Sequence, residues 1–281
     1  MSDSVNHHYV SECLIKNFYN AQEGKIFLFD KQRTNHFSRP GTKKIFSHPY
    51  DNTSLINGKV SNHIEEELNT YFENDFPRHY QNILAFVEGD HGRDILGSVE
   101  YVAQMGLIGD LRNTVTKNDM EMDVFGAFDH IFSNATGELG SEWRNVKDNY
   151  REFKLLTRQS YLDYAVDLFS RMGRWNFYLL TSPPGHFFFL SDCTGYIRKG
   201  RLNEYFNPDA LDTVEIGMPL NSHLFLLVNP EKYRKYDSIL RQASAKTCRT
   251  INDQLFKFSK KWVACQDKAF LKSYTDQLNG D

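Results

Sequence analysis

Apolar positions along the first third of the chain change from a strand-like to a helical pattern. The short run Lys25–Asp30 is rich in Ile and Phe and predicts a buried strand, with Gln32–Phe37 as its hairpin partner. The pair Asn57-Gly58 predicts a turn after a Pro- and Gly-containing loop. From Ser61 onward, Ile64, Leu68, Tyr71 and Phe72 recur at intervals of three and four, which indicates an amphipathic helix.

The later pattern is helical in the middle of the chain and strand-like after Gly173. The periodicity predicts three helices, over Asp94–Thr114, Asp119–Phe132 and Ser141–Met172. Apolar and aromatic runs then predict three strands, over Trp175–Thr181, His186–Leu190 and Leu224–Val228, the last after a break at Gly217–Leu220. A stripe of apolar residues spaced three and four apart predicts a final helix over Ala243–Gln266.

Strands at both ends of a helical middle predict an α+β fold, because no βαβ repetition is present. We expect a mainly helical single domain, residues 1–281, with an N-terminal hairpin and a small late antiparallel sheet. No internal repeat or low-complexity linker divides it. Its parts would be an N-terminal arm and hairpin (1–58), a helical middle (59–172), a strand-rich part (173–230) and C-terminal helices (231–272).

Composition is that of an ordinary globular protein of 281 residues, with 40% hydrophobic and 25% charged residues. No apolar run is long enough to cross a membrane, and the N-terminus lacks the apolar stretch of a secretory signal. The four Cys are scattered without a CxxC pair, which favours reduced thiols. These features predict a cytoplasmic protein with no membrane partner, and they do not specify its oligomeric state.

Charge is distributed unevenly along the chain although the net charge is only −3. Residues 60–95 hold eight acids and two Arg, whereas residues 231–272 hold eleven Lys or Arg and four acids. The basic C-terminal region could bind nucleic acid or another anionic partner. The alternative is that these residues form solvated helix faces, some of them opposite the acidic segment.

Two adjacent imidazoles, His7 and His8, stand next to Tyr9 just inside the N-terminus. A His pair held by ordered structure can move protons, bind metal or bind phosphate near neutral pH. Leu14, Ile15 and Phe18 directly after it would anchor the arm. In an extended arm, alternation would turn only one of the two His toward the core.

The opening His7-His8-Tyr9-Val10 and the following Leu14 and Phe18 resemble the start of domain-of-unknown-function family 4238, a mostly prokaryotic family. Ser11 and Glu12 stand where that family has Pro and Gln. Further similar stretches follow in the same order, namely Gly24–Asp30, Gln104–Arg112, Phe189–Asp192, Met218–Leu220 and Ile251–Val263. The resemblance implies positions for a site and implies no activity.

Gln104 and Arg112 would lie two turns apart on one face of a mostly apolar helix. An Arg in such a place needs an anionic partner. The partner is either a bound phosphate or a structural carboxylate from Asp110, Glu66 or Glu73.

Glu66 and Glu73 are seven residues apart and would share a face of the helix that begins near Ser61. Paired carboxylates beside an imidazole can hold Mg²⁺ or Mn²⁺, which are therefore the candidate cofactors. The alternative is that both are solvated.

Ser191 and Asp192 close an apolar strand, a position where a carboxylate is either catalytic or starts a turn. In the resembling family Asn and Pro follow the Asp, and here Cys193 and Thr194 replace them.

Two function classes remain, because the chain has no Walker loop, GxGxxG, HExxH or GxSxG motif. In the first, a nuclease-like toxin or defence effector acts on phosphodiesters or nucleotides. His8, Arg112 and Asp192 would be catalytic, and substrate would be bound by His7, Tyr9, Gln104 and Ser191. In the second, the same residues form a structural network, and the basic C-terminal helices bind a partner. Cys13, close to His8, is the candidate for a Cys nucleophile, and the alternative, which we favour, is a buried structural thiol.

Overall fold

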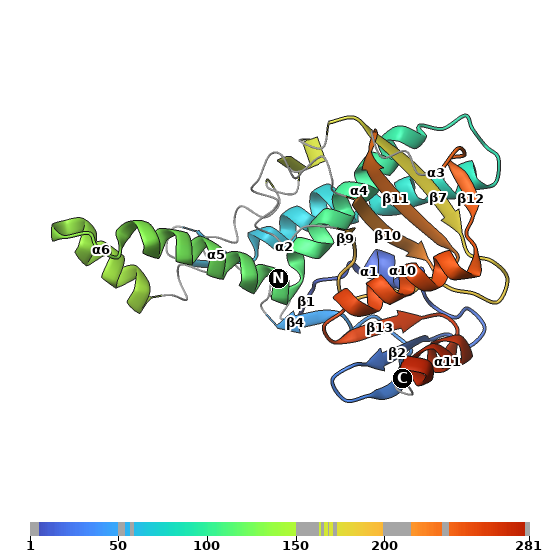
Figure 1. The fold of residues 1–281 in the computed structure, drawn as a ribbon, viewed down its shortest axis with the longest axis horizontal. Coiled ribbons are helices and arrows are strands. Elements are labelled where there is room, and N and C mark those ends of the chain that lie inside the picture. Colours follow the sequence, from blue (N-terminus) through green and yellow to red (C-terminus); the bar gives the residue numbers. More distant parts are fainter. Residues whose placement is uncertain are drawn as a thin grey trace.

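The protein has an α+β fold in its computed structural model, with two sheets and helices packed around them (Figure 1). The structure describes residues 6–49, 54–56, 59–149, 173–198, 215–231 and 236–278, and isolated helical positions between 163 and 170. The predicted turn at Asn57-Gly58 lies outside these residues.

The larger sheet has five strands in the order β12-β7-β11-β10-β9. All neighbours are antiparallel except β12, which runs parallel to β7. The strands are β7 (Trp175–Thr181), β9 (Tyr196–Arg198), β10 (Glu215–Asn221), β11 (Leu224–Pro230) and β12 (Leu240–Gln242). Every residue of β11 is buried, which explains its nearly continuous apolar sequence.

The second sheet has four strands and joins distant parts of the chain, in the order β3-β2-β13-β8. They are β2 (Ile26–Asp30), β3 (Asn35–Arg39), β8 (Leu190–Ser191) and β13 (Trp262–Cys265). The predicted hairpin is therefore confirmed, but it forms part of a sheet completed by C-terminal residues. Two smaller pairs are β1 (Asn6–His8) with β4 (Ser47–Pro49), and β5 (Ser54–Ile56) with β6 (Lys59–Ser61).

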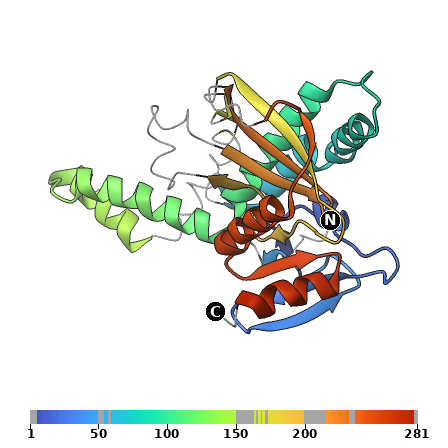
Figure 2. The same cartoon turned by 45° about the vertical axis from the view of Figure 1, so that its right-hand side comes forward.

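The helices surround these sheets, apart from α5 and α6, which project away from the body in both views (Figures 1 and 2). Helix α11 covers the four-stranded sheet. The helices are α1 (Glu12–Lys16), α2 (His63–Leu68), the π-helical turn η1 (Asn69–Glu73), α3 (Phe76–Val87), α4 (Ile95–Arg112), α5 (Thr114–Phe132), α6 (Gly137–Asp148), α10 (Ala245–Phe258) and α11 (Lys268–Leu278). In the part of the chain that the structure describes, none has the length and apolar character needed to cross a bilayer.

Helix α4 lies directly on the larger sheet because small residues allow close contact. A Cβ added to Gly106 would lie 3.3 Å from Sδ of Met218 on β10. A Cβ on Gly109 would lie 2.5 Å from Cβ of Thr194, so no larger residue fits there without a shift. This packing fixes the C-terminal end of α4, where Arg112 lies.

Strand β7 separates the two hydrophobic clusters of the protein. Phe177 and Leu179 contribute to the cluster that contains α4, while Tyr178 and Leu180 contribute to the cluster that contains α10 and α11. Alternate residues of one strand thus fill both cores, as the two-residue period of a strand requires.

The predicted final helix is wrong in its second half. Helix α10 ends at Phe258, and Trp262–Cys265 form β13, which pairs with β2 on one side and β8 on the other. The apolar spacing of three and four continues into this strand by coincidence, because β13 is buried on both faces. Such a strand shows no alternation that distinguishes it from a helix.

Two further strand predictions need correction. The predicted break at Gly217–Leu220 lies inside β10, which accommodates Pro219 next to a register shift. The predicted strand at His186–Leu190 is reduced to β8, because the side chain of Asn252 binds the backbone before it. Its Oδ1 accepts from Phe189 N at 3.1 Å, and its Nδ2 donates to Phe187 O at 2.8 Å.

The other predicted elements are confirmed at β7, β11, α4 and α5. The predicted helix from Ser61 is divided into α2, η1 and α3. Of the predicted helix over 141–172, residues up to Asp148 belong to α6, and most of the remainder lies outside the described residues.

Candidate functional site

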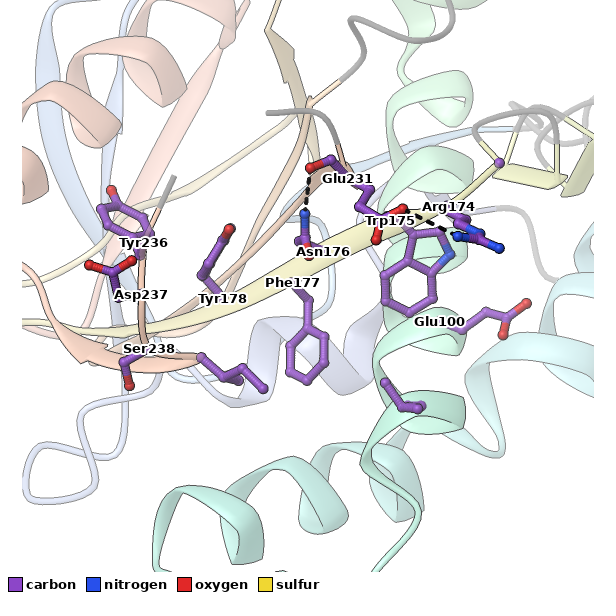
Figure 3. A pocket seen from close by; sticks show the side chains of 13 residues that line it. Glu100, Arg174, Trp175, Asn176, Phe177, Tyr178, Glu231, Tyr236, Asp237 and Ser238 are labelled. Carbon is purple, nitrogen blue, oxygen red and sulfur yellow. Dashed lines mark hydrogen bonds and ion pairs between the residues drawn. The ribbon is translucent and has the colours of Figure 1, made fainter. Parts of the chain in front are cut away.

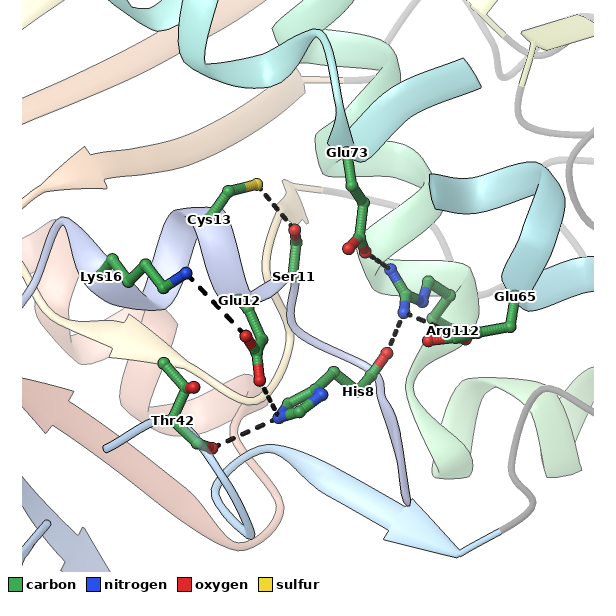
Figure 4. Close-up of polar contacts among 9 residues, drawn as sticks. All are labelled: His8, Ser11, Glu12, Cys13, Lys16, Thr42, Glu65, Glu73 and Arg112. Carbon is green, nitrogen blue, oxygen red and sulfur yellow. Dashed lines mark hydrogen bonds and ion pairs between the residues drawn. The ribbon is translucent and has the colours of Figure 1, made fainter. Parts of the chain in front are cut away.

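Arg112 is buried at the end of α4, with only 5% of its surface exposed, and it binds three partners (Figure 4). Its Nη1 donates to Oε1 of Glu73 at 2.8 Å, and its Nη2 lies 3.8 Å from Oε2 of Glu65. Nη2 also donates to the main-chain carbonyl of His8. The guanidinium therefore connects the N-terminal arm to the acidic helical segment, and the partner is a structural carboxylate, as one of the two alternatives predicted.

The π-helical turn η1 explains why Glu65, and not Glu66, reaches Arg112. A π-helix has more residues per turn than an α-helix, so residues separated by it align at a longer spacing. Glu65 and Glu73, eight apart, both contact Arg112, while the side chain of Glu66 is exposed. The seven-residue pairing of Glu66 with Glu73 assumed an uninterrupted α-helix.

The two N-terminal imidazoles face different environments, as expected for an extended arm. His7 is fully buried, whereas 14% of the His8 side chain is exposed. Nε2 of His8 lies 3.3 Å from the carbonyl oxygen of Thr42 and 3.5 Å from Oε1 of Glu12 (Figure 4). His7 is thus the residue on the core side, and the ring of His8 is the more accessible of the two.

Tyr9 and Cys13 belong to the packing around this network. Tyr9 is 7% exposed and packs edge-on against Phe46, with ring centroids 6.2 Å apart. The pKa of the Cys13 thiol is raised to about 11, mainly by burial and further by the nearby charge of Glu73. The hydrogen bond with Ser11 lowers this pKa but does not cancel the increase. The thiol is therefore neutral near pH 7, so it lacks the thiolate that a nucleophile requires.

Asp192 lies beyond β8, and its carboxylate binds a loop rather than Arg112. The oxygens accept from the backbone N–H groups of Lys260 at 2.9 Å, Lys261 at 2.6 Å and Trp262 at 3.2 Å. Burial raises the pKa of this carboxyl, although these backbone donors oppose the shift. The carboxylate fixes the turn between α10 and β13, which explains why the helix ends there.

Only the main chain of Asp192 reaches the end of α4, where its carbonyl accepts from Nδ2 of Asn113 at 2.9 Å. Ser191 is fully buried, and its hydroxyl donates to the carbonyl of Cys193. Gln104 is half-buried two turns from Arg112 and makes no hydrogen bond to the Arg112 network within the described residues. The structure thus places His8, Arg112 and Glu73 together and directs the side chains of Asp192 and Ser191 elsewhere.

The comparison with protein families agrees with the N-terminal resemblance. Residues 6–104 match the family described as protein of unknown function (DUF4238). The DUF4238-like segment contains His7, His8, Glu65 and Glu73, but Arg112 and Asp192 lie after it. No curated protein and no solved structure matches this chain.

The DUF4238-like segment does not assemble a cluster typical of a metal site. Across the described ranges, no group of three or more His, Cys, Asp or Glu side chains is placed to hold a metal ion. Glu73, one of the two predicted ligands, binds Arg112 instead.

Asp110 is the titratable residue whose role the sequence did not predict. It was a candidate partner for Arg112, but the two side chains point to different sides of α4 because they are two residues apart. Desolvation raises the pKa of the half-buried Asp110 to about 7, and Asp110 in turn helps to raise the pKa of buried Cys193. The sequence did contain a sign of this desolvated carboxyl, because Asp110 is an acid among the apolar residues of the Gln104–Arg112 helix.

We expect Asp110→Asn to remove a pH-dependent loss of stability. The pKa of Asp110 is higher in the folded protein than in the unfolded chain. Its protonation therefore stabilises the fold, with the full effect below the unfolded pKa of 3.8, and this stabilisation is lost as the pH rises through about 7. At about pH 8 the free energy of unfolding of the variant, measured with urea, should exceed that of wild type by about 1–2 kcal/mol. At about pH 5 the difference should be smaller. An equal difference at both pH values, or no contrast with exposed Asp90→Asn, would contradict this assignment.

Proposed function

We propose that this protein is a binding protein whose N-terminal polar network is structural and whose C-terminal helices bind nucleic acid. The network supports a structural role because both Nη atoms of Arg112, the ring of His8 and the carboxylate of Asp192 contact other groups of the protein. A buried guanidinium already held by two carboxylates has little capacity to neutralise a phosphate.

The observation that carries the proposal is the set of cations on residues 244–278. Seven Lys and Arg occur there with three Asp. Within the described part of the chain, none of these cations lies within 4.0 Å of a carboxylate oxygen. Unpaired cations on one part of a surface attract polyanions.

The acidic segment 60–95 does not neutralise these cations. Three of its eight carboxylates form ion pairs within the segment, with Glu67 at 2.7 Å from His63, Asp75 at 3.3 Å from Arg78, and Asp90 at 3.3 Å from Arg93. The alternative that the acidic and basic segments face each other therefore has no support among these contacts.

A cavity of about 400 Å³ between α10 and α11 offers a place for part of such a partner. It is lined by His186, Ala245, Lys246, Arg249, Asn252, Phe270, Ser273, Tyr274 and Gln277. Lys246 and Arg249 are exposed, and the guanidinium of Arg249 lies 5.6 Å from the centre of the Tyr274 ring. The ring of Tyr274 is buried and cannot stack on a base, so the cavity contributes its exposed cations, which can bind phosphates.

We expect the double variant Lys246→Glu/Arg249→Glu to lose nucleic-acid binding. Wild type should bind labelled single-stranded RNA or DNA in fluorescence anisotropy, more weakly at about 200 mM than at about 50 mM salt. The variant should bind at least about tenfold more weakly, with the salt slope reduced by about 2.

The matched control is Lys43→Glu/Lys147→Glu, which makes the same charge change at exposed positions away from α10 and α11. Equal loss of affinity in both double variants would mean that only net charge matters. No binding by wild type would remove nucleic acid as the partner.

The phosphodiesterase hypothesis remains a second candidate, favoured by the partly exposed ring of His8 beside Glu12. Incubating the same probes with Mg²⁺, Mn²⁺ or chelator tests it. His8→Ala is a suitable variant, because Arg112 binds the main-chain carbonyl of His8 and not its ring. Cleavage by wild type that this variant loses while folded would establish the enzyme, and intact probes would favour the binding protein.

A further inference from the structure

Two cavities of the protein differ in the charge of their walls. The cavity between α10 and α11, of about 400 Å³, is lined by Lys246 and Arg249, and none of its described lining residues is Asp or Glu. The cavity along β7, of about 660 Å³, is lined by Glu100 and Glu231, and its Arg174 lies 4.0 Å from Glu231 (Figure 3). An anion is therefore attracted to the cavity between α10 and α11 and repelled by the carboxylates of the other.

The two cations of the α10–α11 cavity lie on one face of α10, because Lys246 and Arg249 are three residues apart. Both residues are exposed. Nη1 of Arg249 donates to Oε1 of Gln277 on α11 at 2.5 Å, and the guanidinium carbon lies 5.6 Å from the centre of the Tyr274 ring. An amide and an aromatic ring hold the guanidinium in place without neutralising it. Its other N–H groups have no acceptor among the described residues, so they can bind a ligand.

The polar groups at the floor of this cavity already have partners. Asn252 is fully buried, and its Oδ1 and Nδ2 bind the main chain just before β8. Tyr274 is buried as well, and its hydroxyl donates to Oδ1 of Asp253 at 2.5 Å. Among the described contacts, Asp253 forms no ion pair with Arg249, although it follows it by one turn of α10. The polar part of a ligand therefore binds at the rim, beside the two cations.

The size and charge of the cavity fit one phosphate monoester. Its volume of about 400 Å³ lies toward the lower end of the range of about 300–1,000 Å³ for small-ligand sites, so it holds one small ligand and not a run of nucleotides. A phosphate monoester carries almost two negative charges at neutral pH and three strong acceptor oxygens. A phosphodiester within a strand carries only one charge. Two cations without an anionic partner match the monoester better.

We propose that the cavity between α10 and α11 binds the phosphate monoester of a nucleotide, either at the end of a single strand or in a free mononucleotide. Arg249 and Lys246 bind the phosphate oxygens, and the half-buried rings of His186 and Phe270 on the wall contact the nucleoside. This inference rests on the proposed function for its choice of ligand. It adds that the cavity recognises a terminal phosphate and not the phosphodiesters along a strand.

The test uses the full chain and three single strands of one sequence, each with fluorescein on an internal base. They carry a 5′-phosphate, a 3′-phosphate or hydroxyls at both ends. In fluorescence anisotropy, we expect one phosphorylated strand to bind at least about fivefold more tightly than the hydroxyl strand, because charge-assisted bonds are gained. Adenosine monophosphate should displace it, and adenosine should not. Arg249→Gln should remove the preference, whereas Arg241→Gln, at an exposed position on β12 outside the cavity, should keep it.

The outcomes separate this inference from the proposed function. Equal binding of all three strands would leave nucleic-acid binding in place and overturn the inference. Binding of adenosine monophosphate without any strand would remove nucleic acid as the partner and support the inference for free mononucleotides. No binding of any probe, or a preference that survives in Arg249→Gln, would overturn it. Thermal unfolding shows whether each variant is folded, and Lys246→Gln is the second cavity variant, for which we also expect a weaker preference.

Discussion

Replacing Arg112 with Met should lower the free energy of unfolding by about 3–5 kcal/mol, because two glutamates would lose the cation that compensates them. Glu65 and Glu73 have only 17% and 16% of their side chains exposed, so water replaces the guanidinium poorly. The carbonyl of His8 would lose its donor as well. Urea unfolding followed by circular dichroism measures the change.

Two further variants separate this effect from the loss of a long side chain. Arg174→Met removes an Arg that is 90% exposed and should change stability by less than about 1 kcal/mol. Arg112→Met combined with Glu73→Gln should recover part of the loss, because one uncompensated charge is removed. If the double variant is no more stable than Arg112→Met, the guanidinium does not act through Glu73.

Replacing Asp192 with Ala should cost about 3 kcal/mol or more, because three backbone N–H groups lose their acceptor and each unsatisfied buried donor costs about 1–3 kcal/mol. The loss should be local. Hydrogen exchange should accelerate first at the amides of Lys260, Lys261 and Trp262, which bind this carboxylate in the folded protein.

Asp276→Ala is the control, since that Asp is exposed on α11. Asp192→Asn keeps one acceptor oxygen and should fall between wild type and Asp192→Ala. Protection at these three amides that is unchanged in Asp192→Ala would show that the loop is held by other contacts.

The elements that the sequence predicted well are those whose apolar pattern has one interpretation. Strands β7 and β2 are short apolar runs bounded by turn residues, and α4 is too long for a strand. Strand β13 was missed because it is central in its sheet and buried on both faces. The sequence around β13 does not indicate its partners. Strand β2 lies 232 residues earlier in the chain and β8 about 70 residues earlier.

The site was predicted in part, for physical reasons that differ between residues. A buried Arg on an apolar helix requires an anion, so the pairing of Arg112 with Glu73 could be expected from the sequence. The contribution of Glu65 could not, because it depends on the π-helical turn η1. The orientation of Asp192 could not be predicted either, because its partners are main-chain groups of a distant loop, which any residue type can supply.

The strand order β3-β2-β13-β8 also has a consequence for the order of folding. Strand β2 is made early in synthesis, yet its neighbour β13 is separated from it by most of the chain, with Asp30 and Trp262 232 residues apart. Until β13 leaves the ribosome, one edge of β2 has no partner, and buried residues such as Phe27 and Phe29 remain accessible. Pairing over such a distance slows folding and exposes an aggregation-prone edge. We therefore expect the newly made hairpin to be the part of this protein that most needs chaperone protection.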